Sequence, residues 1–137
     1  RHRVDHLLQL RALQDRTGGF LAYIPLAYQV EDNELGRKFQ IPETTATQDL
    51  REIAVARLLL DNVPHIKAYW VMITPGLAQL GLSYGANDLD GTIIAEEIAH
   101  LAGADTPQGL TREALRRLIT DAGFHPVERD HIYRVYA

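Results

Sequence analysis

The chain has 137 residues, 46% of them hydrophobic and 23% charged, with 14 basic and 18 acidic side chains and a net charge of −4. These proportions are typical of one globular domain and exclude a disordered, collagen-like or low-complexity chain. The acidic balance argues against a nucleic-acid partner, which requires a basic surface. Because the chain has no cysteine, it can form no disulfide and can offer no thiolate to a metal or an iron–sulfur cluster.

The start of the chain and its hydropathy suggest a piece of a longer cytoplasmic protein. No stretch reaches the roughly 18 uninterrupted apolar residues of a membrane span, and no secretion signal opens the chain. We therefore expect neither a membrane partner nor export. The chain begins without methionine, at Arg1, in what reads as the body of a helix. We expect residues 1–137 to form a single structural unit that is truncated at its amino terminus.

Periodicity and turn residues predict the first elements. Apolar residues near helical spacing over 4–13 predict a helix, which the Thr-Gly-Gly sequence at 17–19 ends. The uncharged apolar run 20–28 predicts a strand buried on both faces, with Pro25 at its end or at a bulge. The polar segment 29–46 has no periodicity and is expected to be a long loop of the kind that can close over a site.

The rest of the chain continues as an alternation of helices and strands. The expected elements are, in order, a helix capped by Thr47 that extends to Leu60, a strand over 65–73, a helix capped by Thr74 that ends before Gly85, a short strand over 87–90, a helix from Gly91 to Gly103, a helix over 112–122 capped by Thr111, and a strand over 126–136.

This alternation predicts an α/β fold with parallel strands joined by right-handed crossovers. Three strand–helix units with buried strands suit either an open doubly wound sheet or part of an eight-stranded barrel. Periodicity does not choose between the two. No internal repeat and no linker divides the chain.

Common catalytic motifs are absent. The chain has no glycine-rich nucleotide fingerprint, no phosphate loop, no Gly-x-Ser-x-Gly and no His-Glu-x-x-His, and its only serine, Ser83, falls in a predicted helix. Glu96, Glu97 and His100 would share one helix face, where a carboxylate and an imidazole could meet a metal. Because a metal motif of this kind needs partner ligands that the chain does not repeat, we interpret it as a solvated helix face and predict no metal site.

The most informative polar run is Asn-Asp-Leu-Asp-Gly-Thr at 87–92. It stands where a predicted strand leads into a helix, and ligands of α/β proteins bind at the carboxyl ends of strands. Backbone N–H groups at 91–93 could hold an anion there. The alternative interpretation is a turn followed by an ordinary helix cap, since Asp-Gly is a common turn and Thr a common cap.

Three further side chains have two interpretations each. Tyr28 and Trp70, late in two predicted strands, could border the same ligand, or they could be core residues, as large aromatics usually are. Lys67, inside an apolar strand, is either a charge at the strand end or an inward cation that needs a partner. His65, beside a proline, is interpreted as a loop residue.

Four segments together carry a resemblance to a known family. They are Gly-Gly-Phe-Leu-Ala-Tyr-Ile-Pro-Leu-Ala-Tyr (18–28), Ile-Ala-Val-Ala-Arg-Leu-Leu-Leu-Asp-Asn-Val-Pro-His-Ile-Lys-Ala-Tyr-Trp-Val-Met (53–72), Gly-Ala-Asn-Asp-Leu-Asp-Gly-Thr (85–92) and Thr-Pro-Gln-Gly-Leu-Thr-Arg-Glu (106–113). In this order they resemble the C-terminal part of the aminofutalosine synthases, radical S-adenosylmethionine enzymes of the futalosine route to menaquinone. The related dehypoxanthine futalosine cyclases carry Gln and Ser at the positions of Lys67 and Tyr69, which favours the synthases.

The resemblance implies the C-terminal portion of a (β/α)8 barrel, about strands six to eight with their helices and a tail. It also implies S-adenosylmethionine and a 4Fe-4S cluster held by Cys-x-x-x-Cys-x-x-Cys, a motif that this chain lacks. The implied reaction adds the 5′-deoxyadenosyl radical to 3-[(1-carboxyvinyl)oxy]benzoate and yields aminodeoxyfutalosine. The 137-residue chain alone is then expected to be inactive.

The resemblance further implies which residues line the site. Residues Ile24, Pro25 and Leu26 would lie against the adenosyl group, that is, the cofactor. The residues expected to bind substrate are Tyr28, Trp70, Asn87, Asp88, Thr92 and Glu96. In this hypothesis Thr92 and the following helix start position a substrate carboxylate, and Asp88 or Asn87 bonds a polar edge of the ligand.

The expected partners are a small-molecule substrate and the missing N-terminal half of the barrel. Three strands of a barrel leave two open sheet edges, so an isolated piece is expected to self-associate or to be marginally stable. The alternatives are a related radical enzyme such as the cyclase, a split enzyme whose other half is a separate chain, and a stand-alone α/β binding or interaction domain without catalysis.

Overall fold

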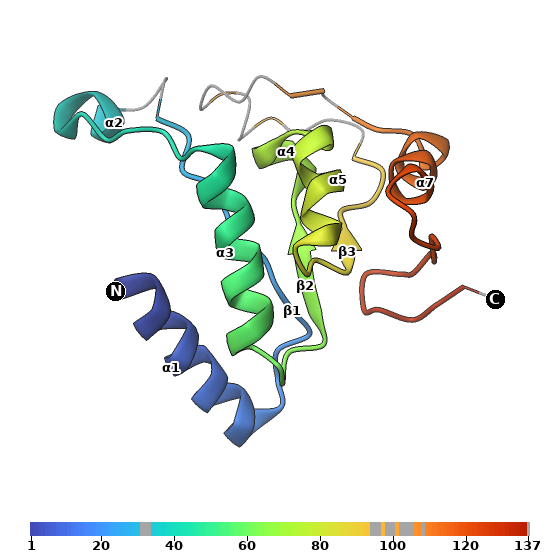
Figure 1. The fold of residues 1–137 in the computed structure, drawn as a ribbon, viewed down its shortest axis with the longest axis horizontal. Helices are drawn as coiled ribbons and strands as arrows, with labels where there is room; N and C mark the ends of the chain where they lie inside the picture. The colour runs from blue at the N-terminus through green and yellow to red at the C-terminus, as the bar shows by residue number, and fades with distance from the viewer. Residues whose placement is uncertain (31–33, 94–96, 98–100, 102–105, 108, 137) are drawn as a thin grey trace.

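The computed structural model describes residues 1–137 except 31–33, 94–96, 98–100, 102–105, 108 and 137. At its centre lie three short parallel strands, β1 (Ala22–Tyr23), β2 (His65–Ala68) and β3 (Asp88–Leu89), in the order β1-β2-β3. Ala22 lies opposite His65, and Lys67 lies opposite Asp88. The predicted α/β class and the parallel pairing are confirmed (Figure 1). The arrangement is compatible with part of a (β/α)8 barrel.

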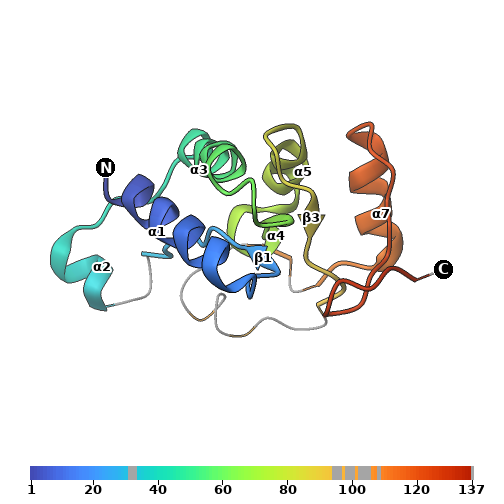
Figure 2. The ribbon, with the colours of Figure 1, turned by 90° about the horizontal axis from the view of Figure 1, so that it is seen from below.

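Six helices surround this sheet within the described residues. They are α1 (His2–Thr17), α2 (Glu34–Phe39), α3 (Ala46–Leu59), α4 (Trp70–Ile73), α5 (Pro75–Ser83) and α7 (Arg112–Asp121). Two of them, α3 and α5, pack directly on β2, while α1 packs on α3 and α7 packs on α5. Figure 2 shows α3, α5 and α7 in a row along one side of the strands.

The core lies between β2 and this row of helices. Ile66 and Ala68 of β2 and Ile53 of α3 are completely buried. Gly81 of α5 allows the close approach, because a Cβ there would lie 3.1 Å from Ile53 Cδ1 and 3.2 Å from Ala68 Cβ. Since side chains alternate along a strand, Lys67 points to the opposite face of the sheet, which therefore carries the polar chemistry.

The helix ends largely follow the sequence signals. Helix α1 ends at Gly18, which is left-handed with a φ of 58° and donates its N–H to Gln14 O at 2.8 Å. The side chains of Thr74 and Thr111 accept the predicted bonds at the starts of α5 and α7. The predicted cap of α3 was wrong: Thr45, not Thr47, caps it, in a reciprocal capping box with Gln48.

Two predicted strands are shorter than expected. Only Ala22 and Tyr23 of the run 20–28 are in a strand, and Leu21, Ile24 and Leu26 are 40% to 65% exposed. Burial on both faces was therefore wrong, because only two residues of the run join the sheet and Ile24 and Leu26 lie beyond the end of β1. The strand over 65–73 ends at Ala68 and continues as α4, since an apolar run fits a buried helix as well as a buried strand.

Two other segments differ from the prediction. The expected loop 29–46 contains α2, which has Glu34 in its first turn and Arg37 and Lys38 in its last, the arrangement that suits the helix dipole. The expected strand 126–136 is a turn closed by one antiparallel bridge, because Asp130 Oδ1 accepts the N–H groups of Ile132 and Arg134.

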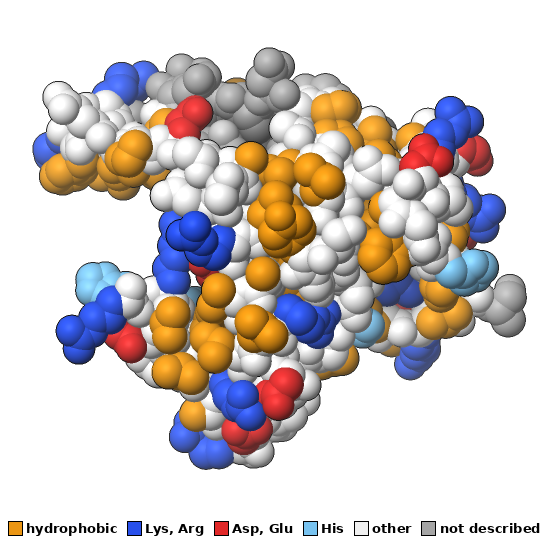
Figure 3. Space-filling model, viewed as in Figure 1, with side chains coloured by type: hydrophobic (Ala, Val, Ile, Leu, Met, Phe, Trp, Pro, Cys, Tyr) orange, Lys and Arg blue, Asp and Glu red, His pale blue; other side chains and the backbone are white. Residues whose placement is uncertain are grey.

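The helix predicted from Gly91 to Gly103 lies mostly outside the described residues, and residues 91–93 are not helical. In the described part of the chain, no helix combines the length and the apolar character needed to cross a membrane. Apolar side chains also remain at the outer surface of the helices, as Figure 3 shows over α1 and α3, where Val4, Leu8 and Leu58 are 41%, 46% and 77% exposed.

Candidate functional site

A cluster of four charged side chains and one tyrosine occupies the sheet face opposite α3 and α5. We call it the sheet-face cluster, and its members are Lys67, Asp88, Asp90, Arg129 and Tyr133. Lys67 is 9% exposed, and its Nζ lies 2.7 Å from Asp90 Oδ1 and 3.6 Å from Asp88 Oδ2. Of the two interpretations of Lys67, the structure supports the inward cation with acidic partners.

Arg129 joins this cluster from the C-terminal segment. Its Nε donates to Asp88 Oδ1 at 2.8 Å and its Nη2 to Asp88 Oδ2 at 2.6 Å, a two-point contact. Tyr133 donates its hydroxyl to Asp88 Oδ2 at 3.2 Å, and the guanidinium carbon of Arg129 lies 4.0 Å from the centre of the Tyr133 ring. The bond to Asp88 raises the pKa of Arg129, so this side chain is a permanent cation.

The same C-terminal segment covers the first residues of β2 and β3. The Tyr133 ring stacks on His65 with ring centres 3.9 Å apart and an angle of 19° between the planes. Burial, assisted by Asp88, raises the pKa of Tyr133 to about 12, and burial lowers the pKa of His65. His65 is thus part of a strand and a packed ring pair, not the loop residue that the sequence suggested. The sequence did not indicate that Arg129 and Tyr133 belong to this site, because they lie 41 and 45 residues from Asp88 along the chain.

Asn87 uses its side chain to join the elements around it. Its Oδ1 accepts from Ile66 N at 2.9 Å and from Arg57 Nη2 at 2.6 Å, while its Nδ2 donates to Pro64 O at 3.0 Å. An amide group has few further bonds to offer. Asn87 therefore fixes the start of β3 against β2 and α3.

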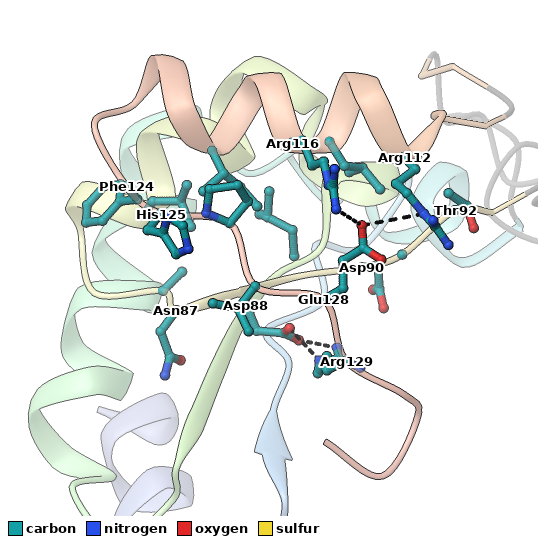
Figure 4. A pocket seen from close by; sticks show the side chains of 18 of the residues that line it. Asn87, Asp88, Asp90, Thr92, Arg112, Arg116, Phe124, His125, Glu128 and Arg129 are labelled. Carbon is teal, nitrogen blue, oxygen red and sulfur yellow. Dashed lines mark hydrogen bonds and ion pairs between the residues drawn. The ribbon is translucent and has the colours of Figure 1, made fainter. Parts of the chain in front are cut away.

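A cavity of about 460 Å³ lies between the run 87–92, α5, α7 and the C-terminal segment. Leu82, Leu115 and Val127 contribute apolar walls. Figure 4 shows Arg112 and Arg116 of α7 pointing toward Glu128, at nitrogen–oxygen distances of 3.5 and 2.7 Å.

Asn87, Asp88 and Thr92 all line this cavity, so the structure brings three of the predicted substrate residues together. Thr92 is exposed and lies outside any helix or strand.

The two aromatic residues predicted to border the substrate, Tyr28 and Trp70, do not line the same cavity. Tyr28 is 46% exposed and lines a second cavity of about 210 Å³, together with Asp49 and Met72. Trp70 has no exposed surface, and its Nε1 donates to Asp90 O at 3.3 Å. The structure thus places Trp70 in the core beneath the sheet-face cluster, where it holds the backbone of Asp90.

The three residues expected to bind the cofactor, Ile24, Pro25 and Leu26, line neither of these two cavities. Ile24 and Leu26 are 40% and 65% exposed after β1, with Pro25 partly buried between them. Glu96, and His100 of the same motif, lie outside the described residues. Among the residues that the structure does describe, no three His, Cys, Asp or Glu side chains converge in a way that could hold a metal ion.

Comparison with known proteins places the chain in a family. Residues 17–137 match the CofH/MqnC C-terminal region. This chain belongs to the CofH/MqnC family. It is 56% identical over 133 residues to the aminodeoxyfutalosine synthase of Thermus thermophilus, and the matched region covers 96% of this chain and 36% of that protein.

Two further relatives extend the comparison. The chain is 49% identical to the aminodeoxyfutalosine synthase of Streptomyces coelicolor, over 98% of this chain and 37% of that protein. It is 42% identical to the 5-amino-6-(D-ribitylamino)uracil–L-tyrosine 4-hydroxyphenyl transferase of Archaeoglobus fulgidus, over 98% of this chain and 39% of that protein. The chain thus spans little more than a third of the length of the curated relatives that it matches.

Proposed function

We propose that this chain is the C-terminal part of a cytoplasmic radical S-adenosylmethionine enzyme that makes aminodeoxyfutalosine for menaquinone synthesis. The reaction would add a 5′-deoxyadenosyl radical to 3-[(1-carboxyvinyl)oxy]benzoate. One observation carries the proposal: identity is 56% and 49% to two aminodeoxyfutalosine synthases, but 42% and 41% to relatives with other names, the Archaeoglobus transferase and a cyclic dehypoxanthine futalosine synthase.

The chain's own residues do not fit the role of cluster ligands. It contains no cysteine, and its described residues offer no group of metal-ligating side chains. In the proposed enzyme, a 4Fe-4S cluster and its three thiolates therefore belong to the part of the protein outside these 137 residues. We propose that the 137 residues alone are inactive.

Among the described residues β3 pairs with β2 alone, and its other edge supports the proposal of a larger barrel. Asp88 and Leu89, the two residues of β3, both line the 460 Å³ cavity, although neighbouring side chains of a strand point to opposite faces. Both residues can border one cavity where it runs along the edge of the strand, and the N–H and C=O groups at such an edge can pair with a further strand. We propose that a strand from the missing N-terminal half lies here, beside α7. Pairing of two copies through the same edge is the competing outcome.

The residues after the strands would bind and orient the ligands. Ile24 and Leu26 present exposed apolar surface after β1, with Pro25 between them, and we propose that all three pack against the adenosyl group. We propose that Tyr28 borders the substrate from the second cavity. Packing of this kind excludes water from a radical reaction and holds the reacting atoms close.

The run 87–92 would hold the polar groups of the substrate. We propose that the exposed hydroxyl of Thr92 and the N–H groups at 91–93 bind a substrate carboxylate. Asp88 accepts two bonds from Arg129 and one from Tyr133, so we propose that it acts on the substrate through the charge of the sheet-face cluster and not through a direct bond. Asn87 and Trp70 would position the site without touching the substrate. Asn87 does so through its bonds with Ile66 and Arg57. Trp70 does so through its bond to the backbone of Asp90.

The test uses the intact protein of which this chain is the C-terminal part, with its cluster reconstituted. We expect it to form aminodeoxyfutalosine from S-adenosylmethionine and 3-[(1-carboxyvinyl)oxy]benzoate, and to leave dehypoxanthine futalosine unchanged. Turnover of dehypoxanthine futalosine instead would assign the cyclase activity. An intact gene product that starts near Arg1 and binds no iron would favour the stand-alone domain.

The role of Thr92 is tested separately in the same protein. Thr92→Val removes the hydroxyl and keeps the shape, so KM for the substrate is expected to rise about tenfold, the cost of one bond to a charged group. Thr92→Ser keeps the hydroxyl and serves as the matched control, with KM near that of the wild type. Equal KM values in all three proteins would remove Thr92 from the site.

A further inference from the structure

We infer that Lys67 recognises the negative charge of the substrate, and that Arg129 is the positioning residue that keeps the Lys67 charge available by neutralising Asp88. This inference rests on the proposed function, in which the substrate carries two carboxylates. It concerns the sheet-face cluster, of which only Asp88 belonged to the predicted substrate-binding set.

The four charged side chains of the cluster form two ion pairs, Arg129 with Asp88 and Lys67 with Asp90, and the first pair has more hydrogen bonds than the second. Asp88 receives two bonds from Arg129, at 2.8 and 2.6 Å, and a third from the Tyr133 hydroxyl at 3.2 Å. Lys67 approaches Asp90 to 2.7 Å but stays 3.6 Å from the nearer oxygen of Asp88, outside hydrogen-bond distance. Arg129 therefore satisfies Asp88, and Lys67 is left with one close carboxylate.

Lys67 keeps capacity for a further acceptor. An ammonium group has three N–H donors, and among the described residues Asp90 takes one of them at hydrogen-bond distance. The Lys67 side chain retains 11% of its surface and that of Asp90 22%, on the sheet face turned away from α3 and α5. A carboxylate that reaches this face would meet a cation held in place by its neighbour.

Removing Arg129 would change this arrangement in a defined way. Two carboxylates would then face one ammonium, the cluster would carry one net negative charge, and Lys67 would be drawn toward both. An anionic ligand would meet repulsion where it now meets attraction, in a partly buried setting where charges are weakly screened. A neutral ligand of the same shape would feel neither effect. The charge of the ligand therefore separates this role from a structural one.

The experiment measures equilibrium binding to the intact protein by calorimetry. The probes are 3-[(1-carboxyvinyl)oxy]benzoate and its uncharged dimethyl ester. Arg129→Gln is expected to weaken binding of the diacid about tenfold and to leave the ester within about twofold. The double variant Arg129→Gln/Asp88→Asn restores a neutral cluster, so its affinity for the diacid is expected to return to within about threefold of the wild type. Arg134→Gln removes a charge from the same exposed turn without a contact to Asp88 and serves as the matched control.

Each outcome decides the inference. It is overturned if Arg129→Gln binds the diacid as the wild type does, if diacid and ester weaken equally, or if the double variant stays as weak as Arg129→Gln. Should Arg129→Gln fail to fold, Asp88→Asn alone decides: its cluster carries an extra positive charge, and unchanged diacid binding would refute the role of the cluster. A wild-type protein that does not bind the diacid at all overturns the proposed function together with this inference, whereas the failures above leave the proposed function standing.

Discussion

The side chain of Arg57 lies directly against Gly85. Its Nε donates to Gly85 O at 2.7 Å, and its Nη2 reaches Asn87 Oδ1 at 2.6 Å. Gly85 has a φ of +108°, and a Cβ on it would lie 2.8 Å from both Cβ and Cγ of Arg57. This contact ties α3 to the turn between α5 and β3, and so it sets the position from which the run 87–92 begins.

Gly85→Ala is expected to destabilise the protein by about 1–3 kcal/mol, because the new methyl group collides with Arg57 and the positive φ is unfavourable for alanine. Urea unfolding of the intact protein measures the loss. Gly76→Ala is the control, since Gly76 has no neighbour within 4 Å of its missing Cβ and no positive φ. Equal stability of the two variants would contradict the close contact.

Thr45→Ala is expected to cost about 1 kcal/mol, because it removes the side-chain acceptor of the α3 capping box. Thr47 lies inside the exposed first turn of the same helix, so Thr47→Ala should leave the stability unchanged or raise it slightly. Thermal unfolding of both variants compares the two positions. A larger loss at Thr47 would restore the cap that the sequence suggested.

Asn87→Ala is expected to cost about 2–3 kcal/mol, because Ile66 N–H and Pro64 C=O would each lose a partner. Substrate affinity of the folded fraction should stay near that of the wild type, since the Asn87 amide is occupied within the fold. Thr92→Ala should show the reverse pattern, with stability within about 0.5 kcal/mol and weaker substrate binding. Urea unfolding and calorimetry together distinguish the two residues.

The stability of the protein should fall on acidification through the titration of His65. Burial lowers the pKa of His65 in the folded state below its ordinary value of 6.5, so the unfolded chain binds more protons in the interval between the two pKa values. Stability therefore rises with pH across this interval and is lost as the pH falls through it. His65→Phe keeps a ring to stack on Tyr133 and removes the titrating group, so its melting temperature should depend less on pH between about pH 5 and 7. An unchanged pH dependence would assign the effect to other groups.

Much of the local structure was predictable from short stretches of the chain. The caps at Thr74 and Thr111 and the left-handed Gly18 depend on neighbours within about four residues, and the sequence shows them directly. The extent of the strands was less predictable. Whether Tyr69 to Ile73 continues a strand or starts a helix depends on what covers that apolar run, and the run itself is compatible with both.

The candidate site divides in the same way. The order of residues was enough to single out the polar run 87–92 at the end of a strand, but it left Lys67 with two interpretations. The folded arrangement shows that Lys67 faces Asp90 and that Arg129, from a segment expected to be a strand, binds Asp88. Backbone turns and caps are satisfied by adjacent residues, whereas a buried charge takes its partner from whichever segment packs on the same face of the sheet.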